Sequence, residues 1–151
     1  MTPTQIVAAR PLFKVTLAYF CLYYVFCFFQ GLSKVFLYFT TRKDANGKAP
    51  SLREHKYESK RGLGLIADRT FGNMVEQAPP FLTCLWMYGL VFDPKHAAAA
   101  GWWYIGFRAI YPFVFALGAP WLFISTLANY AVIGLMMVRV LVRVRKTQAH
   151  F

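Results

Sequence analysis

Two short groups of polar residues lie inside otherwise apolar stretches of this chain. Arg69, Asn73 and Glu76 follow one another at intervals of four and three residues, and Arg108 and Tyr111 lie three residues apart in a second stretch. These spacings place each group on one face of a helix. Guanidinium groups bind carboxylates, and a glutamate can bind an amine. Together the side chains could hold a small anionic or zwitterionic ligand between helices.

Arg108 lies about midway along its apolar stretch and therefore needs a partner. A charged side chain at the centre of a bilayer costs about 2.5–3.5 kcal/mol even on insertion scales, which give the lower values. Glu76 is the only carboxylate inside an apolar run, so it is the expected counter-ion of Arg108. The pair could be purely structural, because buried ion pairs often only lock helices together. It could also belong to a ligand site, and the two roles are compatible.

Three prolines lie beside these polar residues. Pro79 and Pro80 follow Glu76, and Pro112 follows Tyr111. A proline has no amide proton, so it leaves a carbonyl oxygen free one helical turn earlier. The prolines therefore add hydrogen-bond acceptors at the depth of the polar residues, and Pro112 is expected to kink its helix.

The composition indicates an integral membrane protein of one domain. Of the 151 residues, 58% are hydrophobic and 15% are charged, whereas soluble domains have about 25% charged residues. The net charge is +11, but the basic residues lie mainly between or after apolar stretches. This distribution favours anionic lipid headgroups over nucleic acid as partners. The cysteines and histidines lack metal-ligand spacing, so no metal site is predicted.

The predicted fold is an all-α, four-helix membrane bundle formed by residues 1–151. Four apolar stretches are long enough to span a membrane, at about 12–39, 71–92, 97–117 and 120–140. Asp93 and Pro94 are typical of a helix start, and Gly118 with Pro120 marks a break between helices. Residues 40–70 are predicted to form a polar, basic loop. Because the chain is also basic after its last span, charge hardly decides the orientation, and we place the loop on the cytosolic, matrix or stromal side.

Both motifs resemble those of the MAPEG family, the membrane-associated proteins of eicosanoid and glutathione metabolism. The likeness covers four spans in the family's order and a polar loop after the first. The matching residues are Arg69, Asn73 and Glu76 (Arg-x-x-x-Asn-x-x-Glu), Ala78-Pro79-Pro80-Phe81, Leu85-Trp86, and Arg108 and Tyr111 (Arg-x-x-Tyr).

The resemblance implies a homotrimer of four-helix subunits with glutathione bound at the subunit interfaces. A lipophilic substrate would enter from the bilayer. Arg69, Asn73, Glu76, Arg108 and Tyr111 would contact glutathione. Family members also use an arginine near the end of the first helix, for which Arg42 is the candidate here.

The chain also departs from the family pattern. Gln77 and Phe115 stand where members often have tyrosines. Active members carry an arginine early in the fourth helix that activates the glutathione thiol, and this position falls near Leu122. A free thiol has a pKa of about 8.5, and the thiolate is the nucleophile, so a nearby cation or strong donor is needed. Arg108 and Ser125 are the remaining catalytic candidates.

Two functions therefore stay open. The first is a glutathione transferase or peroxidase that acts on lipophilic electrophiles. The second is a non-catalytic accessory or structural subunit of a larger membrane complex, which the missing tyrosines and arginine favour. Either would reside in the endoplasmic reticulum or another intracellular membrane, or alternatively in a mitochondrial inner or plastid membrane.

Overall fold

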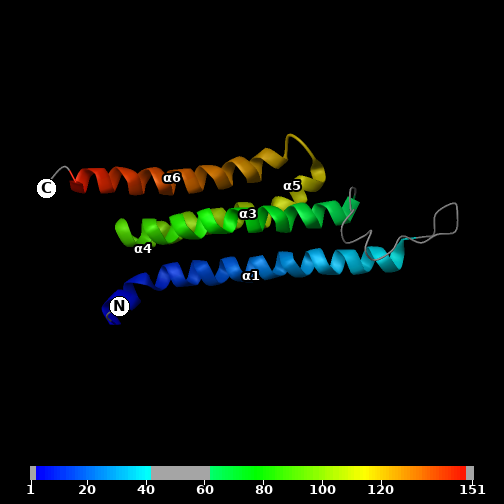
Figure 1. The fold of residues 1–151 in the computed structure, drawn as a ribbon, viewed down its shortest axis with the longest axis horizontal. Helices are drawn as coiled ribbons and strands as arrows, with labels where there is room; N and C mark the ends of the chain where they lie inside the picture. The colour runs from blue at the N-terminus through cyan, green and yellow to red at the C-terminus, as the bar shows by residue number, and fades with distance from the viewer. Residues whose placement is uncertain (1–2, 42–61, 149–151) are drawn as a thin grey trace.

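The structure, a computed structural model, describes residues 3–41 and 62–148. In this part every regular element is an α-helix, which confirms the predicted all-α class. The helices are α1 (Pro3–Thr40), α3 (Gly62–Val91), α4 (Pro94–Ala109), α5 (Tyr111–Leu117) and α6 (Leu122–Gln148). Figure 1 shows that they run alongside one another, and that α1 begins at the end of the molecule where α6 finishes.

Two of the described helices are long and apolar enough to cross a membrane. They cover Ile6–Thr40 and Leu122–Gln148, and they correspond to the first and last predicted spans. α3 is interrupted by polar residues and two prolines, and α4 has only 16 residues. The spans at 71–92 and 97–117 thus remain predictions, although both segments are largely helical.

The predicted loop is too long at its C-terminal end. Residues 62–70 belong to α3, which begins nine residues before the predicted span. Gly64, Ala67 and Thr70 are buried at three-residue intervals in this first part of the helix. The polar residues of this segment favour a loop, but its small residues form a helical contact face.

The third predicted span is divided in two. A kink was expected at Pro112, and the helix instead breaks at Ile110, which ends α4 and precedes α5. Pro112 lies in the first turn of α5, where a missing amide proton costs nothing. The amides of Phe113 and Val114 both bond to the carbonyl of Ile110, at 3.1 and 3.2 Å.

The connections on either side follow the sequence signals. The Asp93 carboxylate accepts a hydrogen bond from the backbone amide of His96 at 3.0 Å and caps α4, with Pro94 in the first turn. That hydrogen bond holds the pKa of Asp93 below its ordinary value. Gly118, with φ of 79°, ends α5, and α6 starts at Leu122, two residues later than predicted.

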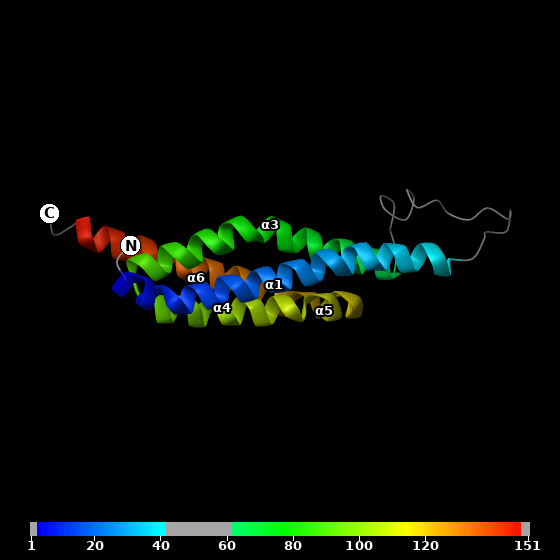
Figure 2. The ribbon, with the colours of Figure 1, turned by 90° about the horizontal axis from the view of Figure 1, so that it is seen from below.

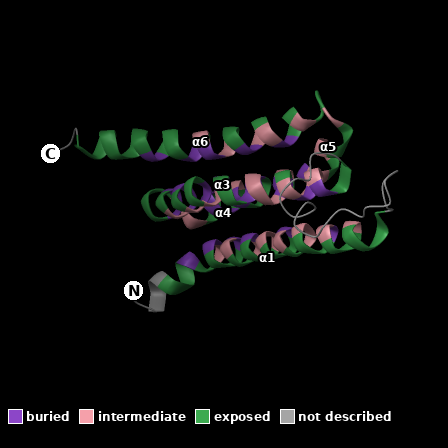
Figure 3. Ribbon diagram, turned by 45° about the vertical axis from the view of Figure 1, so that its right-hand side comes forward, coloured by how far each residue is buried: buried purple, intermediate pink, exposed green. Residues whose placement is uncertain are grey.

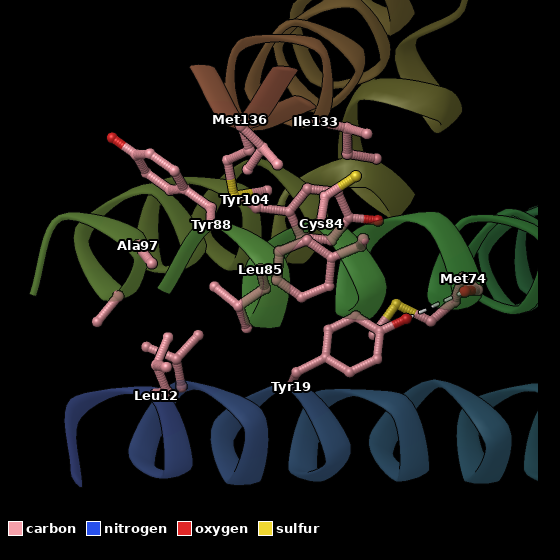
Figure 4. Packing of buried hydrophobic residues seen from close by; sticks show 14 of the residues in the cluster. Leu12, Tyr19, Met74, Cys84, Leu85, Tyr88, Ala97, Tyr104, Ile133 and Met136 are labelled. Carbon is pink, nitrogen blue, oxygen red and sulfur yellow. Dashed lines mark hydrogen bonds between the residues drawn. The ribbon is translucent and has the colours of Figure 1, made fainter. Parts of the chain in front are cut away.

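Aromatic side chains from three helices form the centre of the core. Tyr19 of α1 lies 5.0 Å from Phe81 of α3, and Phe81 stacks on Tyr104 of α4 with ring centroids 3.8 Å apart. The Tyr19 hydroxyl donates to the carbonyl oxygen of Met74 at 3.2 Å (Figure 4). The Tyr19 phenol thus gains a polar partner within an apolar core.

The outward faces remain apolar. Buried residues lie where helices face one another, while exposed residues cover the outside (Figure 3). Phe28 and Leu32 of α1 and Leu127 of α6 are each more than 60% exposed. Large exposed apolar surfaces of this kind suit a lipid environment or a second protein chain.

Candidate functional site

A hydrogen bond joins the two motifs. The Asn73 side-chain amide on α3 donates to the Tyr111 hydroxyl at 2.6 Å, across 38 residues of sequence. Tyr111 opens α5, and the break at Ile110 places it there. The Arg108 guanidinium lies over the Tyr111 ring, 5.6 Å from its centroid. Tyr111 therefore contacts both Asn73 and Arg108.

The other two motif residues surround this hydrogen bond. Arg69 and Glu76 lie on α3 on either side of Asn73, and both are exposed. The Tyr111 side chain itself is buried, with 2% of its surface exposed. The hydroxyl that Asn73 binds thus lies at the junction of α3, α4 and α5, and Arg69 and Glu76 share the helical face of Asn73.

Arg108 is not paired with Glu76, so the expected counter-ion was wrong. Its guanidinium donates to the Gln77 side-chain oxygen and, at 3.2 Å, to the Tyr104 hydroxyl. Arg108 is 0% exposed, whereas Glu76 is exposed and makes no ion pair with it. Successive helical residues point about 100° apart. Position 77 therefore faces the core, and position 76 faces outward.

A neutral cluster encloses the buried guanidinium. The Tyr104 hydroxyl also donates to the Gln77 oxygen at 3.2 Å, and the Arg108 carbon Cζ lies 5.5 Å from the Tyr104 ring centroid. Within the described part of the chain, the Arg108 Nε and Gln77 Nε2 atoms have no hydrogen-bond partner. Among the described residues no carboxylate forms an ion pair with Arg108, and its guanidinium is held by the neutral Gln77 and Tyr104 side chains and lies over the Tyr111 ring.

Sequence reasoning missed Gln77 and Tyr104 as members of this cluster. Gln77 stood out only as a departure from the family's tyrosine. Tyr104 belongs to neither motif. Its position four residues before Arg108 places both on one helical face, and that spacing was the available signal.

Ser125 and Leu122 lie on the other side of this junction. The Ser125 hydroxyl is buried and donates to the carbonyl oxygen of Phe107 at 2.6 Å. Its single proton is thus committed within the subunit, which argues against the expected role as a donor to a thiolate. Leu122 is half-buried at the start of α6, and α6 contains no basic residue before Arg139. Arg42, the remaining candidate, lies outside the described residues.

An apolar groove separates α3 from α6 along the outside. It has a volume of about 460 Å³ and begins three residues after Glu76, at the two prolines. Figure 2 shows that α3 is bowed along its length, and prolines within a helix commonly produce such bends. The lining residues are Pro79, Pro80, Thr83, Cys84, Met87, Met137, Val140 and Leu141.

The chain matches a protein-family model over most of its length. The model of the MAPEG family matches residues 15–142. The chain belongs to the MAPEG family. This confirms the resemblance based on the two motifs, and it places the chain in a membrane-associated family connected with glutathione and eicosanoid metabolism. The comparison with curated proteins found no match.

Proposed function

We propose that this MAPEG protein binds glutathione at the joined motifs and acts as a transferase or peroxidase on lipophilic electrophiles. The observation that carries the proposal is the 2.6 Å hydrogen bond between Asn73 and Tyr111. It unites two motifs that are far apart in sequence around a single polar junction.

The charges of the junction match those of glutathione, which carries two carboxylates, one ammonium group and a thiol. The exposed Arg69 can bind a carboxylate, and the exposed Glu76 can bind the ammonium group. Asn73 lies between them and can bond to the peptide backbone. Arg108 is enclosed, so we assign it the role of fixing Tyr111 and adding positive potential beneath the ligand.

The apolar groove offers a route for the second substrate. Its α3 wall continues directly from Glu76, and α6 supplies the opposite wall. Its lining is almost entirely apolar, which suits a lipid-soluble electrophile that diffuses from the bilayer. The exposure of Arg69 and Glu76 in a single chain also leaves room for a second copy to complete the site, as in the proposed homotrimer.

A second candidate function is a non-catalytic accessory subunit. It is favoured by Ser125, whose proton is committed to Phe107, and by the leucine at position 122. Without an adjacent cation, most of the bound thiol stays protonated near neutral pH. Such a protein would be part of a larger assembly. Its motif residues would either still bind glutathione or contribute only to packing.

Glutathione titration calorimetry on the purified protein in detergent tests the proposed site. Arg69→Ala and Glu76→Gln should each weaken glutathione binding by about tenfold or more, because each removes a charge-assisted contact. Arg143→Ala, at the far end of α6, serves as a matched control and should leave the affinity unchanged. Wild-type affinity in both site variants would refute the assignment.

A further inference from the structure

A second cavity lies toward the start of α1, away from the joined motifs. Its volume is about 270 Å³, and it is bounded by α1 and α4. Val7, Arg10, Pro11 and Lys14 line it from one face of α1, and Trp102 lines it from α4. The cavity thus combines two cations with one large aromatic ring and a small apolar wall.

Tight helix packing fixes the positions of these groups. Beside the cavity, a Cβ atom added at Gly101 would lie 2.5 Å from Cγ1 of Val15. Only glycine permits this approach of α4 to α1. Since Val15 follows Lys14 and Gly101 precedes Trp102, the contact holds the two lining side chains close to each other.

The two cations have no anionic partner in the described part of the chain. Arg10 and Lys14 are one turn apart on the same face, where like charges repel each other. None of the ion pairs between described residues includes either side chain. No acidic residue lines the cavity, so an anion from outside the described chain would relieve the repulsion.

The described carboxylates are engaged or distant. Asp68 bonds with Lys34 at 2.8 Å, and Asp93 accepts from His96. Gly89 of α3 packs against Leu12, near the start of α1. Glu76 lies thirteen residues before Gly89 on the same helix. That separation is about 20 Å along a helix, which is too far for direct pairing with Arg10.

The surroundings of the cavity suit a position near lipid phosphates. A long apolar run begins at Val15, directly after Lys14. Trp102 and Trp103 are 50% and 67% exposed, and tryptophans gather at the membrane–water interface. The basic last turn of α6, with Arg145 and Lys146, lies at the same end (Figure 1).

We propose that Arg10, Lys14 and Trp102 form a binding site for the phosphate headgroup of an anionic membrane lipid. Arg10 can contact two phosphate oxygens at once, and Lys14 adds a compact charge. The Trp102 ring lies against the glycerol region, while Val7 and Pro11 contact the start of an acyl chain. The site is separate from the proposed glutathione site.

Native mass spectrometry of the full-length protein with added phosphatidylglycerol tests this site. Arg10→Gln/Lys14→Gln should weaken binding of the first lipid by about tenfold or more, since each cation near an anionic headgroup contributes substantially. The control Arg143→Gln/Lys146→Gln removes the same charge from the same end but should change this affinity by about twofold at most. Equal losses in both double variants would overturn the proposal in favour of diffuse attraction.

Two further measurements separate the alternatives. Millimolar inorganic phosphate should not displace phosphatidylglycerol, and full displacement would mean that the site binds free anions and not lipid. Trp102→Leu retains both cations and changes a half-exposed ring. It should weaken lipid binding by about threefold. Wild-type affinity would exclude Trp102 from the site, and this result does not depend on whether the double variant folds.

Discussion

The buried guanidinium of Arg108 has a neutral side chain as its main partner. A carboxylate at position 77 would neutralise the charge, whereas the Gln77 amide oxygen accepts its hydrogen bond and leaves the charge in place. The spacing of the motif residues predicted that both motifs would lie around one site between helices, but the hydrogen bond between Asn73 and Tyr111 was not predicted. It could not show whether residue 76 or 77 faces Arg108, because this depends on the rotation of α3 about its axis.

The contact between Gln77 and Arg108 should be measurable as an energetic coupling. Gln77→Leu should destabilise the protein by about 2–3 kcal/mol, because it leaves a buried cation short of an acceptor. With Arg108→Leu added, the double variant should lose less than the sum of the single losses, by about 1 kcal/mol or more. Unfolding in detergent measures the stability of the two single variants and of the double variant.

Glu76→Gln combined with Arg108→Leu provides the control cycle. These residues make no ion pair, so their effects should add to within about 0.5 kcal/mol. Strong coupling in the Glu76 cycle, together with none in the Gln77 cycle, would contradict the arrangement described here.

Position 122 tests whether the missing cation limits catalysis. Leu122→Arg should raise the rate at which glutathione displaces chloride from a lipophilic aryl chloride by about tenfold or more, because a nearby cation favours the thiolate. The matched variant Phe123→Arg places the same charge on an outward, 54% exposed position and should give no gain. Equal rates in both variants would show that position 122 does not face the thiol.

At the scale of the helices, close approach determines which surfaces meet. Gly89 lies against Leu12, and Gly101 lies against both Val15 and Leu85. The hydrophobic runs were sufficient to predict the helices and their order. The early start of α3 and the break at Ile110 were not predicted, because tertiary contacts extend one helix while local proline chemistry divides the other.

Filling the contact at Gly101 should separate α4 from α1. Gly101→Val should lower stability by about 1–3 kcal/mol or more, since the branched Val15 side chain cannot rotate away freely. Gly134→Ala is the matched control, because nothing lies within 4 Å of its added Cβ atom. It should be neutral or stabilising by up to about 1 kcal/mol. A stable Gly101→Val protein with unchanged detergent unfolding would contradict the tight packing.

At the scale of the whole molecule, the two proposed sites lie toward opposite ends of the same helices. The joined motifs lie near the start of α3, and the basic cavity lies near its end and the start of α1. Composition was sufficient to predict a helical membrane protein, because apolar residues cover its outer faces. The homotrimer implied by the family resemblance stays a prediction, since the same faces suit lipid and protein equally.

Both motifs of this MAPEG protein are proposed to form one glutathione site. The most direct measurement is native extraction from the source membrane in mild detergent, with mass determination and glutathione titration on the same sample. We predict saturable glutathione binding by a species near three times the subunit mass of 17.3 kDa. A single copy held in a large complex that binds no glutathione would contradict the account and indicate a structural subunit.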